Sequence, residues 1–239
     1  MMEEAIEALG RGEVVLIYDF DSRERETDLV MAAEFMTPKH LYQLRRDAGG
    51  LICTAIDPLA CSAVRLPYFV DILRCACAEH SGNVSSIGSL CERAGDLTYD
   101  SKSSFSIWVN HRNTFTGITD VDRSLTITAL AEAAKKALQG CQVDLSDEFR
   151  SPGHVPVLRA APGLIKDRRG QTELSIALAR AAGVTPATVV CEMLDGETGR
   201  ALSKDDAMKY ARDHGLAFVE GEDVVELYNR TMALAADTV

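Results

Sequence analysis

The chain has 239 residues, 26% of them charged, and a formal net charge of −11, a composition ordinary for a globular protein. The acidic balance argues against nucleic acid and anionic membranes as partners, because both require clustered Lys and Arg. No segment approaches the roughly 20 apolar residues of a membrane span, and the acidic start does not fit a secretory signal, so we expect a cytoplasmic protein with seven free cysteines.

Segments typical of strands and helices alternate along the chain. A helix is predicted over 3–10, and the apolar run 14–18 is typical of a strand buried on both faces. Thr37 and Pro38 predict the start of a helix that ends at Gly49. The other predicted strands are 51–56, 105–109, 189–191 and 217–219, and the other predicted helices are 127–139, 173–182, 203–214 and 222–233.

Helices placed between strands predict a layered α/β fold around a mixed sheet. No linker divides the chain, so one domain is expected over 1–239. The stretch 74–100 is rich in Ser and Gly and is expected to be a long loop or insertion, a kind of segment that is often functional.

The densest chemical signal is the segment 19–28, where five carboxylates and two arginines follow the first strand. In an extended backbone, Glu24, Glu26 and Asp28 would share one face. Three converging carboxylates suit Mg²⁺ or Mn²⁺, and without a metal they would raise one another's pKa, as a general base requires. The alternative is a solvated loop whose acids pair with its own arginines, and the spacing alone does not decide between these readings.

A second signal precedes the helix predicted from residue 173. Arg168, Arg169 and Gly170 come just before Thr172, which we expect to cap the helix. A helix N-terminus with two arginines suits a phosphate group. An exposed basic turn in front of a capped helix is the alternative.

Three further residues are candidates from their local context. His154 follows a Pro-Gly turn at the head of an apolar strand, where it suits a general base or is simply a turn histidine. Glu192 ends an apolar run and is either catalytic or solvated. Cys53 is either a small core residue or a thiol beside a site.

Cys75, Cys77 and His80, with Cys91 further on, superficially resemble a zinc site, but the spacing is not that of paired zinc ligands. The chain has no Walker loop, G-x-G-x-x-G, H-E-x-x-H or G-x-S-x-G motif. These absences disfavour P-loop hydrolases, Rossmann dehydrogenases, zincin proteases and the usual serine hydrolases.

Taken in order, the motifs resemble those of 3,4-dihydroxy-2-butanone 4-phosphate synthase, an enzyme of the riboflavin pathway, over nearly the whole chain. The stretch 74–100 and the segment from Tyr99 to Phe105 resemble the archaeal branch of that family. The motifs that carry the resemblance are Arg23-Glu-x-Glu-x-Asp28, Gly-Gly-Leu-Ile-Cys53, Thr116-Gly-Ile-Thr-Asp-x-Asp-Arg123, Ser151-Pro-Gly-His154, Arg168-x-Gly-x-Thr-Glu173 and Cys191-Glu192.

The resemblance implies conversion of D-ribulose 5-phosphate into L-3,4-dihydroxybutan-2-one 4-phosphate and formate. It further implies Mg²⁺ or Mn²⁺, a three-layer α/β sandwich, and a homodimer with its sites near the interface. By the same resemblance Glu24 would bind the metal, Arg23, Glu26 and Asp28 would contact the sugar or move protons, and His154 and Glu192 would be acid/base residues. The remaining implied substrate contacts are Cys53, Thr116, Arg168, Arg169, Gly170, Gln171 and Thr172.

One departure from the family pattern concerns the metal. Gln171 stands where the family has a histidine that is its second metal ligand. An amide oxygen can bind Mg²⁺, so we expect a metal held by Glu24 with Gln171 or water, but more weakly. The alternatives are an inactive sugar-phosphate-binding relative, or another metal-dependent isomerase or aldolase acting on a sugar phosphate.

Overall fold

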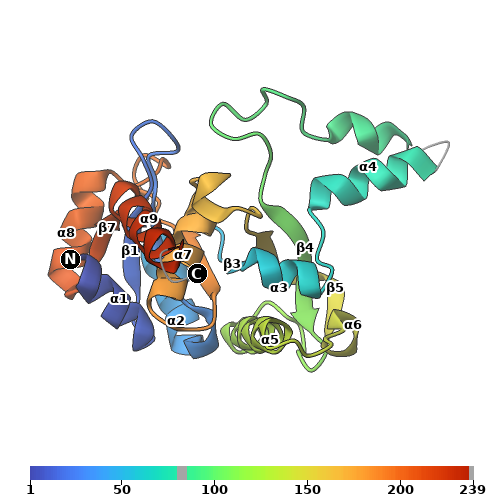
Figure 1. Ribbon diagram of the computed structural model, residues 1–239, viewed down its shortest axis with the longest axis horizontal. Coiled ribbons are helices and arrows are strands. Elements are labelled where there is room, and N and C mark those ends of the chain that lie inside the picture. The colour runs from blue at the N-terminus through green and yellow to red at the C-terminus, as the bar shows by residue number, and fades with distance from the viewer. Residues whose placement is uncertain (80–84, 237–239) are drawn as a thin grey trace.

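The computed structural model describes residues 1–79 and 85–236, and its centre is a mixed seven-stranded sheet in the order β4-β5-β3-β6-β2-β1-β7 (Figure 1). Strand β2 pairs antiparallel with both β1 and β6, while β3 runs parallel to β5 and antiparallel to β6. The strands are β1 (Val15–Tyr18), β2 (Thr27–Ala32), β3 (Cys53–Ile56), β4 (Phe105–His111), β5 (Phe149–Arg159), β6 (Ala187–Glu192) and β7 (Phe218–Glu220).

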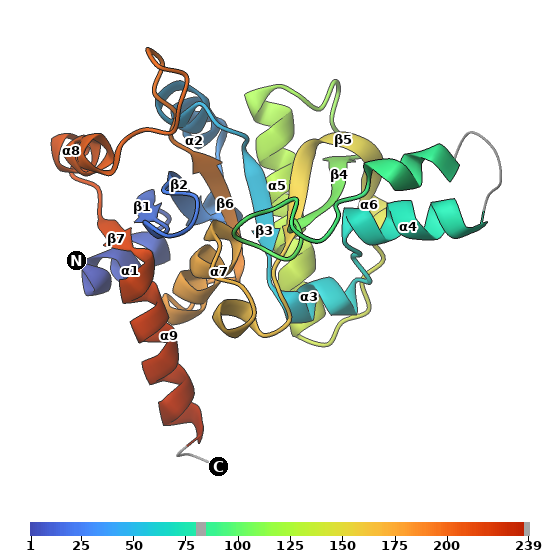
Figure 2. The same ribbon diagram turned by 90° about the horizontal axis from the view of Figure 1, so that it is seen from above.

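Helices cover both faces of this sheet, which confirms the predicted three-layer sandwich (Figure 2). The longer helices are α1 (Met2–Gly10), α4 (Phe69–Glu79), α5 (Asp120–Leu138), α7 (Gln171–Ala181), α8 (Lys204–His214) and α9 (Gly221–Ala236). The shorter helices are α2 (Pro38–Gln43), α3 (Pro58–Ala63) and α6 (Leu145–Glu148), with a π-helical turn η2 (Leu44–Ala48) and three 3₁₀ turns, η1 (Ala33–Phe35), η3 (Ser85–Leu90) and η4 (Leu164–Lys166).

The two faces of the sheet bury alternate residues of each strand, as the pleat requires. Leu29 and Met31 of β2 pack in the core shared with α2, α5 and α8. Val30 of the same strand packs on the other face, in the core shared with α1, α7 and α9. By the same alternation, Asp28 of β2 lies on the α7 face.

Most predicted helices begin and end where their capping residues indicate. Thr37 accepts a hydrogen bond from the N–H of His40, Ser203 caps α8, and Gly49 ends η2 in the left-handed conformation. Helix α5 begins at Asp120, seven residues before the predicted start, because Thr119 caps it there.

The prediction of a loop over 74–100 is wrong in part. Helix α4 continues to Glu79, and η3 follows over Ser85–Leu90. Figure 1 shows α4 projecting away from the sheet. The segment 91–104 then returns over β3 before entering β4, so the irregular part of this stretch lies against the sheet (Figure 2).

Candidate active site

A cavity of about 340 Å³ lies on the α7 face of the sheet, where β2, β3 and β6 meet the start of α7. The segment 91–104 covers it. Two adjoining cavities, of about 370 and 500 Å³, share Tyr99, Asp100 and Arg168 with it. The residues that line the first cavity are Glu24, Asp28, Cys53, Glu92, Leu97, Tyr99, Asp100, Ser103, Ser104, Phe105, Leu158, Arg168, Gln171, Thr172, Val190 and Glu192.

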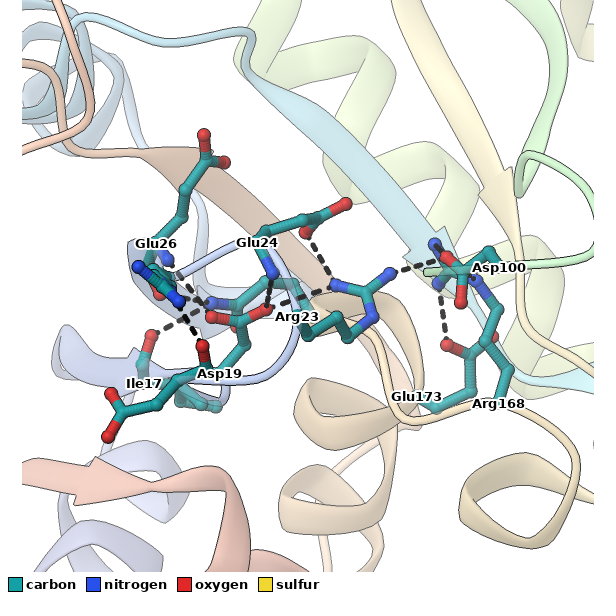
Figure 3. Close-up of polar contacts among 11 residues, drawn as sticks. Ile17, Asp19, Arg23, Glu24, Glu26, Asp100, Arg168 and Glu173 are labelled. Atoms are coloured by element: carbon teal, nitrogen blue, oxygen red, sulfur yellow. Dashed lines mark hydrogen bonds and ion pairs between the residues drawn. The ribbon is translucent and has the colours of Figure 1, made fainter. Parts of the chain in front are cut away.

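The acidic segment before β2 is shaped by Asp19, which is fully buried. One carboxylate oxygen of Asp19 accepts the N–H of Glu26 at 2.9 Å, and the other accepts the N–H of Glu24 at 2.9 Å (Figure 3). Arg23 Nη1 lies 3.2 Å from that second oxygen and 2.5 Å from a carboxylate oxygen of Glu24. Asp19 therefore fixes the backbone from which the site carboxylates project.

The expectation that Glu24, Glu26 and Asp28 share one face of an extended chain is wrong. Residues 21–24 form a turn, and Arg25 has a φ of 59°. Glu24 and Asp28 both line the cavity, whereas Glu26 does not, and in Figure 3 the side chains of Glu24 and Glu26 diverge. The turn also brings Arg23 to the same side as Glu24, where the two residues pair.

Asp28 and Glu192 stand directly opposite each other on the paired strands β2 and β6. Burial first, and then the charge of Glu192, raise the pKa of the Asp28 carboxyl well above its usual value. Burial likewise raises the pKa of Glu192, and burial with the charge of Glu24 raises the pKa of Glu26 to about 7. In all three carboxyls the shift of the pKa favours the protonated form.

The chain just before β3 passes close to Glu192. The N–H of Leu51 donates to Glu192 Oε2 at 2.8 Å, and a Cβ on Gly50 would lie 2.6 Å from the Glu192 carbonyl oxygen. Only glycine allows this approach of one backbone to another. Burial raises the pKa of the Cys53 thiol, so Cys53 lines the cavity as a neutral thiol rather than a thiolate.

Gln171 is the first residue of α7 and is 7% exposed. Its Nε2 donates to the carbonyl oxygens of Ile17 at 3.0 Å and Glu26 at 3.2 Å, which fixes the amide. Its Oε1 is buried and has no hydrogen-bond partner among the described residues. An oriented oxygen without a partner, on a side chain lining a cavity with Glu24, is suited to ligate a hard cation.

The prediction that Thr172 caps α7 is wrong, because the helix begins earlier. Gly170 is the residue before the first turn, and no side chain caps α7. A Cβ on Gly170 would lie 2.7 Å from Cζ of Arg168 and 2.8 Å from Nη2 of Arg23, so glycine allows both guanidinium groups to approach the helix start. Thr172 lines the cavity from the first turn of α7, as does Glu24 from the turn before β2.

Arg168 is held at the cavity by two acids. Its Nη1 lies 2.7 Å from Glu173, which is fully buried, and its Nη2 lies 2.7 Å from Asp100. Arg169, in contrast, is exposed and lines only the adjoining cavity of about 500 Å³. The two arginines are therefore not equivalent, although the sequence places them side by side.

His154 and Thr116 are not brought to this cavity within one chain. Both are exposed, and both lie near Asn110, whose Nδ2 is 3.1 Å from His154 Nδ1 and whose Oδ1 accepts the N–H of His154 at 2.8 Å. A Cβ on Gly117, the residue after Thr116, would overlap the Asn110 amide. Asn110 is buried and orients the histidine ring, and the sequence reading missed it.

His154 lies in an irregular part of β5. The β4–β5 pairing shifts between Val109 and Asn110, whose partners on β5 are Val155 and Arg150. Residues 151–154 therefore stand outside the regular register, and His154 does not line the cavity of its own chain.

Tyr99 and Asp100 were also missed as site residues. The ring of Tyr99 lies 5.0 Å from the Arg23 guanidinium, and Asp100 bridges Arg23 and Arg168. The Ser- and Gly-rich composition of 74–100 predicted a loop of a kind that is often functional, but it does not single out these two residues.

The cysteines considered for zinc do not assemble a site in the described part of the chain. Cys75 is exposed and Cys91 is buried, while His80 lies outside the described residues. Among residues 1–79 and 85–236, no cluster of three or more His, Cys, Asp or Glu side chains is arranged to hold a metal. Glu24 and Gln171 are not a cluster of this kind, because one of the two ligands is an amide.

Comparison with known proteins decides the family. Residues 3–227 match the family model of 3,4-dihydroxy-2-butanone 4-phosphate synthase. The chain belongs to that family. Curated synthases of the same name from Methanosarcina acetivorans and Archaeoglobus fulgidus are 54% and 50% identical to it; the matches cover 94% and 95% of this chain and 89% and 94% of those proteins.

Solved structures agree with this assignment. A crystal structure described as 3,4-dihydroxy-2-butanone 4-phosphate synthase in complex with two magnesium ions is 29% identical, with a TM-score of 0.74 and coverage of 97% of both chains. The match spans both the sheet and the cavity. The chain is therefore an enzyme of the synthase family, which serves riboflavin biosynthesis, with the fold of that family.

Proposed function

We propose that the chain converts D-ribulose 5-phosphate into L-3,4-dihydroxybutan-2-one 4-phosphate and formate with the help of Mg²⁺. The observation that carries this proposal is the single cavity that joins Glu24, Asp28 and Glu192 to Arg168 and Thr172 at the start of α7. One end offers acids and oxygen ligands for the reacting carbons, and the other offers a cation and a helix N-terminus for the phosphate.

Glu24 and Gln171 would hold the metal. Glu24 and Gln171 both line the cavity. The buried Oε1 of Gln171 has no hydrogen-bond partner among the described residues and is therefore available as a ligand. Mg²⁺ held by these two residues would supply a Lewis acid beside the ketose carbonyl. Oxygen ligands alone favour Mg²⁺ over softer ions, so we propose Mg²⁺ rather than Mn²⁺ as the preferred metal.

The carboxyls of Asp28, Glu192 and Glu26 would move the protons. Enolisation, dehydration and formate release each require a proton to be taken or given near the same carbons. Asp28 and Glu192 face each other across paired strands, so one can be ionised while the other stays protonated. The pair would thus supply a base and an acid at one place.

The phosphate end would be bound by Arg168, Thr172 and the open first turn of α7. No side chain in the described part of the chain caps this helix, so its first N–H groups are available to an anion. Glu173 holds Arg168 in place from behind. The phosphate does not react, and its binding positions the reacting carbons against the acids.

His154 and Thr116 would act through a homodimer. They are exposed and lie beside exposed apolar side chains, namely Phe115 (94% exposed), Ile118 and Val121. An apolar patch of this kind around oriented polar groups is typical of an interface. A second subunit packed on this surface would carry His154 toward the partner cavity, where its ring would serve as acid or base.

The protein would work in the cytoplasm. Its cysteines form no disulfide among the described residues, as a reducing compartment favours. No helix in the described part of the chain has the length and apolar character to cross a bilayer.

Formate release from ribulose 5-phosphate tests the reaction directly. Wild-type protein with Mg²⁺ should release formate, and Glu24→Gln should abolish this while leaving the fold intact. Glu13→Gln is a matched control, because Glu13 is an exposed acid that pairs with Arg11 far from the cavity lining. Binding of ribulose 5-phosphate by the wild type without formate would identify an inactive relative, and a different product would identify another sugar-phosphate isomerase or aldolase.

Mixed dimers test the role of the interface. His154→Ser and Glu24→Gln should each be inactive alone. If His154 serves the partner cavity, mixing the two variants should restore about a quarter of the wild-type activity, because half of the randomly paired dimers contain one intact site of two. Restoration would not occur if both residues served the same chain's cavity.

A further inference from the structure

Asp100 lies in the segment that covers the cavity. One oxygen of its carboxylate is close to three guanidinium nitrogens that belong to two arginines. Its Oδ2 lies 2.5 Å from Arg23 Nη2, 2.7 Å from Arg168 Nη2 and 2.9 Å from Arg168 Nε (Figure 3). The Asp100 side chain is only 6% exposed. Two guanidinium groups that come from separate elements therefore converge on a single carboxylate oxygen.

The same arrangement of donors would suit an oxygen of a bound phosphate group. Arginine pairs bind carboxylate and phosphate with the same planar donor groups. Arg168 stands immediately before the open start of α7, and Gly170 lets both arginines approach that helix end. The Asp100 carboxylate thus occupies a position prepared for an anion.

We propose that Asp100 is a specificity-determining residue: its carboxylate fills the anion subsite between Arg23 and Arg168, and a ligand gains that subsite only if it carries a phosphate able to displace it. The proposal rests on the proposed function only in placing the phosphate end at Arg168. A neutral sugar offers nothing to replace Asp100, so it gains no binding energy there.

When a phosphate replaces Asp100, each of the two arginines keeps at least one carboxylate partner. When Asp100 moves away, Arg23 keeps Asp19 and Glu24, and Arg168 keeps Glu173. Of the anchoring acids, Asp19 is fully buried in the connection between β1 and β2 and Glu173 is fully buried in α7, whereas Asp100 belongs to a segment without regular structure. The displaceable partner is therefore the one on the part of the fold that can most easily move.

Competition of this kind lowers the apparent affinity for phosphate. The apparent association constant is that of the open subsite multiplied by the fraction of molecules in which Asp100 has left it. Binding of inorganic phosphate to metal-free protein, measured by calorimetry, tests this without any turnover. Asp100→Asn should bind phosphate about tenfold more tightly than wild type, because the neutral amide no longer competes with the anion for the two arginines. Asp96→Asn is the matched control: it removes one negative charge from the same segment, but Asp96 is exposed and outside the cavity.

Three results would overturn the proposal: weaker phosphate binding by Asp100→Asn, no change, or an equal gain in Asp96→Asn. Weaker binding would show that Asp100 positions the arginines, and an equal gain would show a general effect of charge. Asp100→Ser provides the same test if the Asn variant does not fold.

A second measurement addresses selectivity. Asp100→Asn should tighten binding of ribulose 5-phosphate and leave the binding of unphosphorylated ribulose unchanged. Equal tightening of both ligands would contradict the proposal. Because only binding is measured, failure of this prediction is distinguishable from failure of the formate assay.

Discussion

The buried Asp19 carboxylate allows a worked prediction for Asp19→Asn. Asp19 accepts three hydrogen bonds, from the N–H groups of Glu24 and Glu26 at 2.9 Å and from Arg23 Nη1 at 3.2 Å. An asparagine of the same shape can keep the acceptors on one oxygen only. Its NH₂ group then faces the N–H donors that the other carboxylate oxygen had served.

The cost follows from these contacts. One charge-assisted hydrogen bond is lost, at about 1.5–3 kcal/mol, and the remaining bonds become neutral, at roughly half their former strength. Arg23 also loses a buried acid but keeps Glu24 and Asp100. We expect the free energy of unfolding to fall by about 3–5 kcal/mol, the range for breaking a buried charge pair.

Urea unfolding followed by circular dichroism measures this change, with an unaltered dependence on urea concentration showing that the unfolded states are comparable. Asp21→Asn is the control, because Asp21 is exposed and, among the described residues, its carboxylate accepts from the hydroxyl of Tyr18 and from no backbone N–H. A loss below about 1 kcal/mol for Asp19→Asn, or one no larger than that of the control, would refute the assignment of Asp19 as the residue that shapes this turn.

Three further predictions concern the floor and the ligands of the cavity. In EDTA, wild-type stability should fall as pH rises from about 4.5 toward 7 and above, because the folded state retains protons on carboxyls with raised pKa values that the unfolded chain has lost. Asp28→Asn should therefore stabilise the protein more at pH 8 than at pH 5 in urea unfolding, and an equal effect at both values would contradict this. Gln171→His should bind both Mg²⁺ and Mn²⁺ more tightly in calorimetric titration, with the larger gain for Mn²⁺, since imidazole suits transition ions better than an amide oxygen; tighter Mg²⁺ binding by the wild type would show the expectation to be wrong. Gly50→Ala should cost about 1–3 kcal/mol in thermal unfolding, because its Cβ meets the Glu192 carbonyl oxygen at 2.6 Å, whereas Gly196→Ala, with open space around it, should be close to neutral.

The parts of the fold that follow from local signals could be predicted from the sequence. The apolar run before Asp19 forms the buried strand β1, and the hydroxyls of Thr37 and Ser203 begin helices where they were expected. The early start of α5 was missed because its first turn, beginning at Asp120, is polar and has no apolar periodicity to mark it.

The composition of the cavity was only partly predictable. Glu24 and Thr172 line the same cavity, a proximity that the order of motifs suggested but that local patterns cannot establish. The turn before β2 could not be foreseen, because it depends on Asp19 accepting two N–H groups further along the chain. Asp100 was missed because one acid in an irregular segment carries no spacing signal; its importance arises only from contact with Arg168, 68 residues away.

The cavity has a floor and a cover of different origin. The floor consists of paired strands and the first turn of α7, in which each side chain is tied to the packing of the whole sheet. The cover is the segment 91–104, which supplies Tyr99 and Asp100 but contributes little to either core. Redesign of the ligand range should therefore begin in the cover, where substitutions can be accumulated without eroding foldability, while the floor keeps the reaction constant.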